Sequence, residues 1–188
     1  SFKDRGMVVA VERAVQAGAH AVVCASTGNT AASAAAYAAR AGIQAVVLTP
    51  AGATATAKRA QARAAGAQLI EIRGTFDDAL RLCRELGERD GFLLVNSVNP
   101  DRREGQKSVV GEILEQLGSA PDILALPFGG GGNVSAVATG LAEAGASTRI
   151  VVGQAAERAT TWASAIRISE PAHAANVADL VGSGRVEV

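Results

Sequence analysis

The chain has 188 residues and equal numbers of basic and acidic side chains, 18 of each, so its formal net charge is zero. With no excess of positive charge and no run of Lys or Arg longer than two, nothing favours nucleic acid or an anionic membrane as a partner. Hydrophobic residues make up 48% of the chain and no apolar run approaches transmembrane length, which indicates a folded globular protein without a membrane-spanning helix.

Apolar, β-branched runs alternate with alanine-rich amphipathic runs from one end of the chain to the other. The expected order is helix 4–17, strand 21–25, helix 31–41, strand 45–49, helix 56–65, strand 68–72, helix 75–89, strand 92–95, helix 103–117, strand 123–127, a helix from the following glycines to 144, and strand 149–154. This alternation predicts an α/β fold with open, mostly parallel sheets and helices on both faces. In such sheets ligands bind beyond the carboxyl ends of the strands.

The first loop that follows a predicted strand is unusually polar. Its side chains come from Ser26, Thr27, Asn29 and Thr30, around Gly28. A helix cap would account for one of these residues. Four of them, beside the free N–H groups of a helix start, favour an anion-binding corner.

Four consecutive glycines, Gly129–Gly132, lie between a strand that ends at Pro127 and the next helix. Glycine runs cost backbone entropy and are expected where N–H groups wrap closely around a phosphate. No Lys follows as in a P-loop, and the spacing does not match a dinucleotide-binding fingerprint. A flexible linker is the alternative, but it rarely occupies this position in a compact domain. We therefore interpret the loop as a phosphate cradle.

The third loop, 96–102, is also polar and follows a strand, although a solvated helix start would explain it when it is taken alone. Lys3 has the same ordinary explanation, because most lysines are solvated. A catalytic lysine needs a partly neutral amine, and burial or a nearby helix N-terminus would provide one. His20 and His173 are isolated, and no Ser/His/Asp or Cys/His set and no metal-ligand spacing is present.

Several segments together resemble a known family. They are Ser1–Gly6 (SFKDRG), Ala25–Ser33 (ASTGNTAAS), the strand–glycine loop–helix unit, Asn96–Lys107 and Ala163–Ile168. Their sequences and order resemble the fold type II pyridoxal-phosphate (PLP) enzymes, and threonine synthases in particular. The resemblance covers nearly the whole chain and implies a cytoplasmic PLP-dependent carbon–oxygen lyase of threonine biosynthesis. Its reaction would convert O-phosphohomoserine and water into threonine and phosphate.

The resemblance assigns roles to particular residues. Lys3 would form the Schiff base with pyridoxal 5′-phosphate and shuttle protons, and Asn29 would hydrogen-bond the 3′ oxygen of the ring. The remaining cofactor contacts would come from the phosphate loop, which is Gly129, Gly130, Gly131, Gly132 and Asn133. The substrate would contact Ser26, Thr27, Thr30, Asn96, Ser97 and Arg102. No metal is implied.

The resemblance also implies a domain arrangement. Residues 1–17 and 96–188 would form part of the larger, PLP-binding domain, and residues 18–95 a smaller mobile α/β domain. The family is expected to be homodimeric and to act on a small amino-acid substrate, without nucleic acid or membrane partners. Both ends of the chain look cut, so we expect a fragment that lacks both ends, with weak activity or none.

One departure from the family pattern leaves the specificity open. The phosphate loop of threonine synthases usually reads Gly-Asn-Ala-Gly-Asn, whereas this chain has Gly-Gly-Gly-Gly-Asn. An all-glycine loop is more like that of the serine/threonine dehydratases (deaminases) of the same fold, which are the alternative. A non-catalytic phosphometabolite-binding α/β module is a third possibility.

Overall fold

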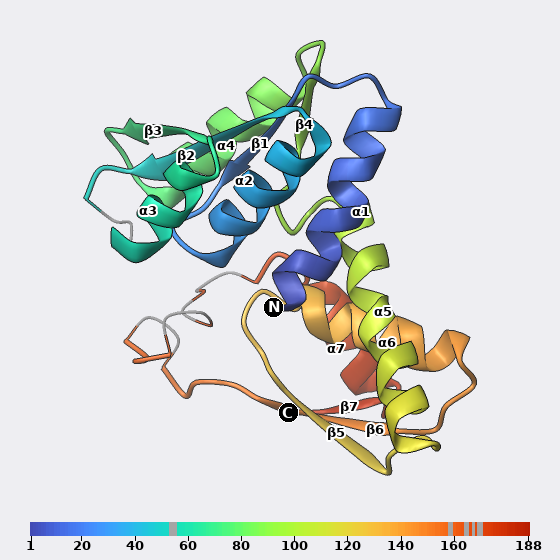
Figure 1. The fold of residues 1–188 in the computed structure, drawn as a ribbon. Coiled ribbons are helices and arrows are strands. Elements are labelled where there is room, and N and C mark those ends of the chain that lie inside the picture. Colours follow the sequence, from blue (N-terminus) through green and yellow to red (C-terminus); the bar gives the residue numbers. More distant parts are fainter. Residues whose placement is uncertain (53–55, 158–159, 164–165, 167, 169–170) are drawn as a thin grey trace. The chain divides into compact units, whose positions relative to one another are not determined.

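The computed structural model describes residues 1–52, 56–157, 160–163, 166, 168 and 171–188 (Figure 1). It contains two compact units, Ser1–Gly105 and Gln106–Val188. Each unit contains one sheet, and every strand pair in the described residues is parallel. The predicted α/β class with parallel strands is therefore confirmed. No described helix combines the length and the apolar character that crossing a lipid bilayer requires.

The first unit has a four-stranded sheet with the strand order β3-β2-β1-β4. Its elements are α1 (Phe2–Gln16), β1 (Ala21–Ala25), α2 (Asn29–Ala41), β2 (Gln44–Pro50), α3 (Thr56–Ala64), β3 (Gln68–Ile72), α4 (Phe76–Gly87), β4 (Phe92–Leu94) and the start of α5 (Pro100–Leu117). Helix α5 begins three residues before the predicted position. Proline is well tolerated in the first turn of a helix, where its missing N–H has no intrahelical partner.

Alternate side chains of β1 enter two separate cores of the first unit. Val22 and Cys24 pack with buried residues of α1, α2 and α3, whereas Val23 and Ala25 pack with α4. Because successive strand residues point to opposite faces, these helices cover both faces of the sheet, as Figure 1 shows for α2, α3 and α4. The first sheet therefore matches the predicted architecture, and its two central strands, β1 and β2, are buried on both sides.

The second unit contains the rest of α5 and a three-stranded sheet with the order β5-β6-β7. Its other elements are β5 (Ile123–Pro127), α6 (Gly132–Glu143), β6 (Arg149–Gly153), α7 (Ala174–Gly182) and β7 (Val186–Glu187). Ile150 and Val152 of β6 pack with residues of α5, α6 and α7 in one core. Ile123, on the opposite face of β5, is 50% exposed. In the part that the structure describes, helices therefore cover one face of this sheet.

The boundary between the compact units differs from the predicted domain boundary. Met7, Ala10 and Ala14 of α1 are fully buried and share a core with β1 and α2, so α1 belongs to the first unit. The sequence analysis grouped residues 1–17 with residues 96–188 on the basis of family resemblance. That grouping stays a prediction about the cofactor-binding domain.

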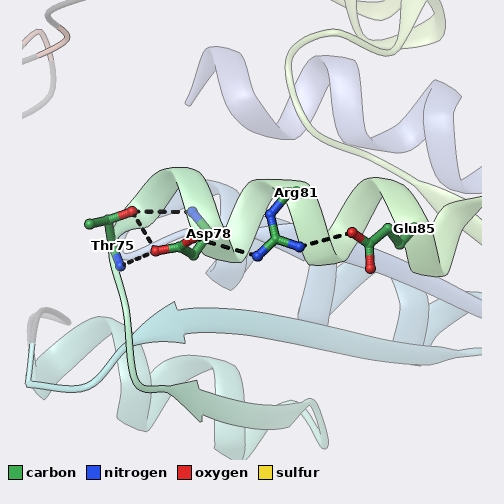
Figure 2. Close-up of polar contacts among 4 residues, drawn as sticks. All are labelled: Thr75, Asp78, Arg81 and Glu85. Atoms are coloured by element: carbon green, nitrogen blue, oxygen red, sulfur yellow. Dashed lines mark hydrogen bonds and ion pairs between the residues drawn. The ribbon is translucent and has the colours of Figure 1, made fainter.

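Helix α4 begins with the capping box that the sequence predicts (Figure 2). The Thr75 hydroxyl accepts a hydrogen bond from the Asp78 N–H at 3.2 Å, and the Asp78 carboxylate accepts one from the Thr75 N–H at 2.9 Å. One turn later, Arg81 donates to Glu85 at 3.0 Å. These contacts satisfy N–H groups at the helix start that have no intrahelical partner.

We expect Thr75→Ala to lower the free energy of unfolding of the first unit by about 1 kcal/mol, because the capping oxygen is lost. Hydrogen exchange of the slowest α4 amides measures this change. Thr75→Ser keeps the hydroxyl and is the matched control. Equal stability of Thr75→Ala and Thr75→Ser would show that the cap contributes nothing.

Candidate active site

The carboxyl ends of β1 and β4 are joined by a buried side chain, Asn96. Its Nδ2 donates to the Ala25 carbonyl oxygen at 2.9 Å, and its Oδ1 accepts from the Ala25 N–H at 2.9 Å. Because β1 and β4 are parallel neighbours, this pair of bonds fixes the point at which the first polar loop leaves the sheet. Asn96 therefore positions the loop, and its predicted contact with substrate stays a prediction.

In the first polar loop, Ser26 caps helix α2. Its buried hydroxyl oxygen accepts from the N–H groups of Gly28 and Ala31, at 3.2 and 3.1 Å. The side chains of Thr27 and Thr30 are half-buried and that of Asn29 is exposed, and no described residue hydrogen-bonds them. Capping thus explains Ser26 alone. The other three polar side chains at this carboxyl end are available to a ligand.

Arg102, in the first turn of α5, is the largest fully buried side chain in the described part of the chain, at 1% exposure. Its Nη1 donates to the Val95 carbonyl oxygen at 2.7 Å, while Nε and Nη2 have no hydrogen-bond partner among the described residues. Burying a guanidinium with unpaired N–H groups is costly. A ligand with an anionic group, such as a phosphate, would satisfy them through two parallel hydrogen bonds.

Lys3 lies in the first turn of α1 and is half-buried. Its Nζ lies 4.4 Å from the centre of the Phe2 ring. Burial and, to a smaller extent, the positive charge of Arg102 together lower the pKa of Lys3 to about 8. At pH 8 about half of the amine is then neutral. A neutral amine is the form that attacks an aldehyde, so Lys3 suits the predicted role.

Helix α1 is anchored beside the first polar loop by Asp4. Its Oδ1 accepts a hydrogen bond from the Ser33 hydroxyl of α2 at 2.7 Å. Burial opposes ionisation of Asp4, but hydrogen bonds from the amino terminus, Ser33 and Ser1 outweigh it and lower the pKa of Asp4. Sequence reasoning quoted Asp4 and Ser33 within its motifs but gave them no role. Their contact joins the lysine segment to the polar loop segment.

The glycine loop of the second unit follows β5 and ends at Gly131, which is the N-cap of α6. No side chain caps α6, so its first N–H groups are open to an anion. Gly131 has a φ of +84°, and a Cβ at this position would lie 3.1 Å from His173 Cβ and Val177 Cγ2. Among the described residues, a Cβ at Gly130 would meet only Ile168 Cδ1, at 3.5 Å. In this structure a side chain is therefore disfavoured at position 131, by crowding and by the positive φ, and is not crowded by the described residues at position 130.

Each unit by itself suits one chemical group of a ligand. In the first unit, the amine of Lys3 with its lowered pKa suits an aldehyde. In the second unit, the uncapped N-terminus of α6 behind the glycine loop suits a phosphate. Among the described residues, no group of three or more His, Cys, Asp or Glu side chains is placed to hold a metal ion. Cys24 and Cys83 are buried free thiols, and burial raises the pKa of each to about 12. Both cysteines are therefore protonated and unreactive at neutral pH.

We expect Lys3 to lose its proton at a pH of about 8. Arg102→Gln removes a neighbouring positive charge, so it raises the pKa of Lys3, although burial still holds it below the ordinary value. NMR titration of lysine labelled with ¹³C at Cε measures this, and Lys58 and Lys107 give the only other signals. Arg40→Gln, at an exposed position, is the control. A Lys3 titration midpoint near 10.5 in the unmodified chain would contradict the expectation.

Comparison with known proteins agrees with these features. The family model of the pyridoxal-phosphate dependent enzymes matches residues 1–188. The threonine synthase of Bacillus sp. (strain ULM1) is 48% identical over 92% of this chain and 53% of its own length. The threonine synthase of Mycobacterium tuberculosis (strain H37Rv) is also 48% identical, over 92% of this chain and 53% of its own length. The chain thus spans about half the length of the curated relatives it matches.

Solved structures show the same fold. The L-serine ammonia-lyase of the fungus Rhizomucor miehei superposes on this chain with a TM-score of 0.86 at 24% identity. The match covers all of this chain and 65% of the lyase. The processed threonine deaminase isoform 2 of Solanum lycopersicum gives a TM-score of 0.76 at 26% identity, over 99% of this chain and 47% of the deaminase. The chain therefore belongs to the pyridoxal-phosphate dependent enzyme family and has its type II fold.

Proposed function

We propose that the protein containing this chain is a threonine synthase, which converts O-phosphohomoserine and water into threonine and phosphate. The observation that carries this proposal is the buried Arg102 guanidinium, whose Nε and Nη2 have no partner among the described residues. A substrate that carries its own phosphate would supply the missing acceptors, in addition to the carboxylate that every amino-acid substrate has. The relatives named threonine synthase support the same substrate.

In this proposal, pyridoxal phosphate supplies an electron sink for carbanions when it is bound. Lys3 would hold the cofactor through its amine and would accept and return protons at the substrate carbons. Its lowered pKa makes both the neutral and the protonated amine available near pH 8. Asn29 would hydrogen-bond the 3′ oxygen of the ring. The backbone N–H groups of the segment from Gly129 to Asn133 would hold the phosphate of the cofactor.

The remaining predicted residues would bind the substrate. Arg102 and Ser97 hold its phosphate, and Thr27 and Thr30 line the position of its amino-acid part. Ser26 and Asn96 already hydrogen-bond backbone groups of the loop, so their main contribution is to place Thr27, Asn29 and Thr30. The preorganised cation and hydroxyl groups would orient the leaving phosphate without rearranging during the reaction.

A second candidate function is a serine/threonine dehydratase. The all-glycine loop favours it, as does the fold shared with an L-serine ammonia-lyase and a threonine deaminase. A Cβ at Gly130 would make an ordinary contact with Ile168 Cδ1, at 3.5 Å, so the described residues do not crowd the first atom of a side chain there. The two functions differ in the anion that they require, because a dehydratase has no substrate phosphate to pair with Arg102.

The test is a titration of the pyridoxal-phosphate-loaded chain with O-phosphohomoserine and, separately, with threonine, followed through the cofactor absorption. We expect O-phosphohomoserine to bind more tightly than threonine. Arg102→Gln should lower the affinity for O-phosphohomoserine by at least tenfold. Arg40→Gln is the control for loss of an exposed arginine. Release of phosphate and of ammonia is measured in the same samples. Tighter binding of threonine, together with ammonia release and no phosphate release, would favour the dehydratase and contradict the proposal.

A further inference from the structure

His173, immediately before α7, lies against the glycine loop. Its backbone N–H donates to the Gly130 carbonyl oxygen at 3.1 Å. A Cβ built on Gly132 would be 3.4 Å from His173 Cδ2 and 3.5 Å from its Nε2. Both the backbone and the half-buried imidazole of His173 therefore contact the loop. The sequence analysis treated His173 as isolated, because these contacts join segments about forty residues apart.

Ser135 is a second polar residue close to the same loop. Ser135, in the first turn of α6, is 3% exposed, and its hydroxyl oxygen has no hydrogen-bond partner among the described residues. Side chains in a helix lean toward its N-terminus, which here is the end that carries the glycine loop. The uncapped N–H groups of α6 and the Ser135 hydroxyl together leave several hydrogen-bonding groups for a ligand at this end.

We propose that His173 is a further anion-binding residue of this loop, and that its Nε2 donates a hydrogen bond to the phosphate held by the loop N–H groups. The Nε2 atom lies beside Gly132, which is the first residue of α6 and carries one of the N–H groups without an intrahelical partner. A phosphate offers several acceptor oxygens, so it can bind the backbone and the imidazole at once. The identification of the phosphate as that of the cofactor rests on the proposed function.

In this chain, the contact also crowds the position that a side chain at residue 131 would take. His173 and Val177 occupy the space that a Cβ at Gly131 would need. In return, the hydrogen bond from the His173 N–H fixes the direction of the Gly130 carbonyl group. His173 thus has a structural part, through its backbone, and a ligand-binding part, through its ring. The two parts can be separated, because only the second depends on the imidazole.

The first experiment uses inorganic phosphate and the ¹⁵N-labelled chain. His20 and His173 are the two histidines, so His20→Ala leaves a single imidazole signal and is also the control for loss of a histidine. We expect phosphate to shift the His173 Nε2 signal and the amide signals of Gly131 to Asn133 with one common midpoint. His173→Ala should weaken phosphate binding about tenfold, and His173→Gln should recover part of this loss because its amide can donate from a similar position.

The second experiment compares pyridoxal phosphate with pyridoxal, which lacks the phosphate. We expect His173→Ala to lower the affinity for pyridoxal phosphate about tenfold and to leave the affinity for pyridoxal unchanged. Equal weakening of both would mean that His173 acts only through the structure, and would overturn the proposal. The proposal would also be overturned if His173→Ala bound phosphate with unchanged affinity, or if the His173 Nε2 signal did not shift when phosphate was added. Phosphate binding at His173 without any capture of pyridoxal phosphate would support this inference and refute the proposed function.

Discussion

The burial of the Arg102 guanidinium is the constraint on which the candidate site of the first unit depends. One N–H group is bonded to the carbonyl oxygen of Val95, just beyond β4, and the rest of the charge has no compensating acceptor in the described residues. A cation in this environment has two consequences. It adds to the effect of burial, which is the larger cause, in lowering the pKa of Lys3, and it favours a bound anion. In the proposed function, this buried charge helps to keep the amine of Lys3 neutral and attracts the substrate phosphate.

Some residues in the motifs of the first unit contact other motifs of the same unit. Asn96 bonds both backbone groups of Ala25, so the loop after β4 holds the loop after β1. The bond between Asp4 and Ser33 connects the helix that carries Lys3 to the helix that follows the polar loop. Several residues that look like ligand-binding positions therefore act by placing others. In the proposed function, Lys3, Asn29 and Arg102 are the residues of this unit that would contact cofactor or substrate directly.

Much of the fold could be predicted from the sequence because its signals are local. The Thr75–Asp78 capping box lies within four consecutive residues, and the alternation of apolar strands with amphipathic helices repeats along most of the chain. Helix α7 was missed, because the pattern weakens after strand β6. The contact between His173 and the glycine loop could not be predicted, since it depends on the packing of α7 beside α6. The burial of Arg102 could not be predicted from the sequence either, because a polar loop ahead of a helix normally indicates solvent exposure.

The attachment of the cofactor to Lys3 is tested most directly by reduction with borohydride. The chain is incubated with pyridoxal phosphate near pH 8, reduced, digested and analysed by mass spectrometry. The lowered pKa and the proposed role of Lys3 together predict a stable adduct on the peptide that carries Lys3, with Lys58 and Lys107 unmodified at the same cofactor concentration. An adduct spread evenly over the three lysines, or found only on Lys58 or Lys107, would contradict the assignment of Lys3 as the cofactor lysine.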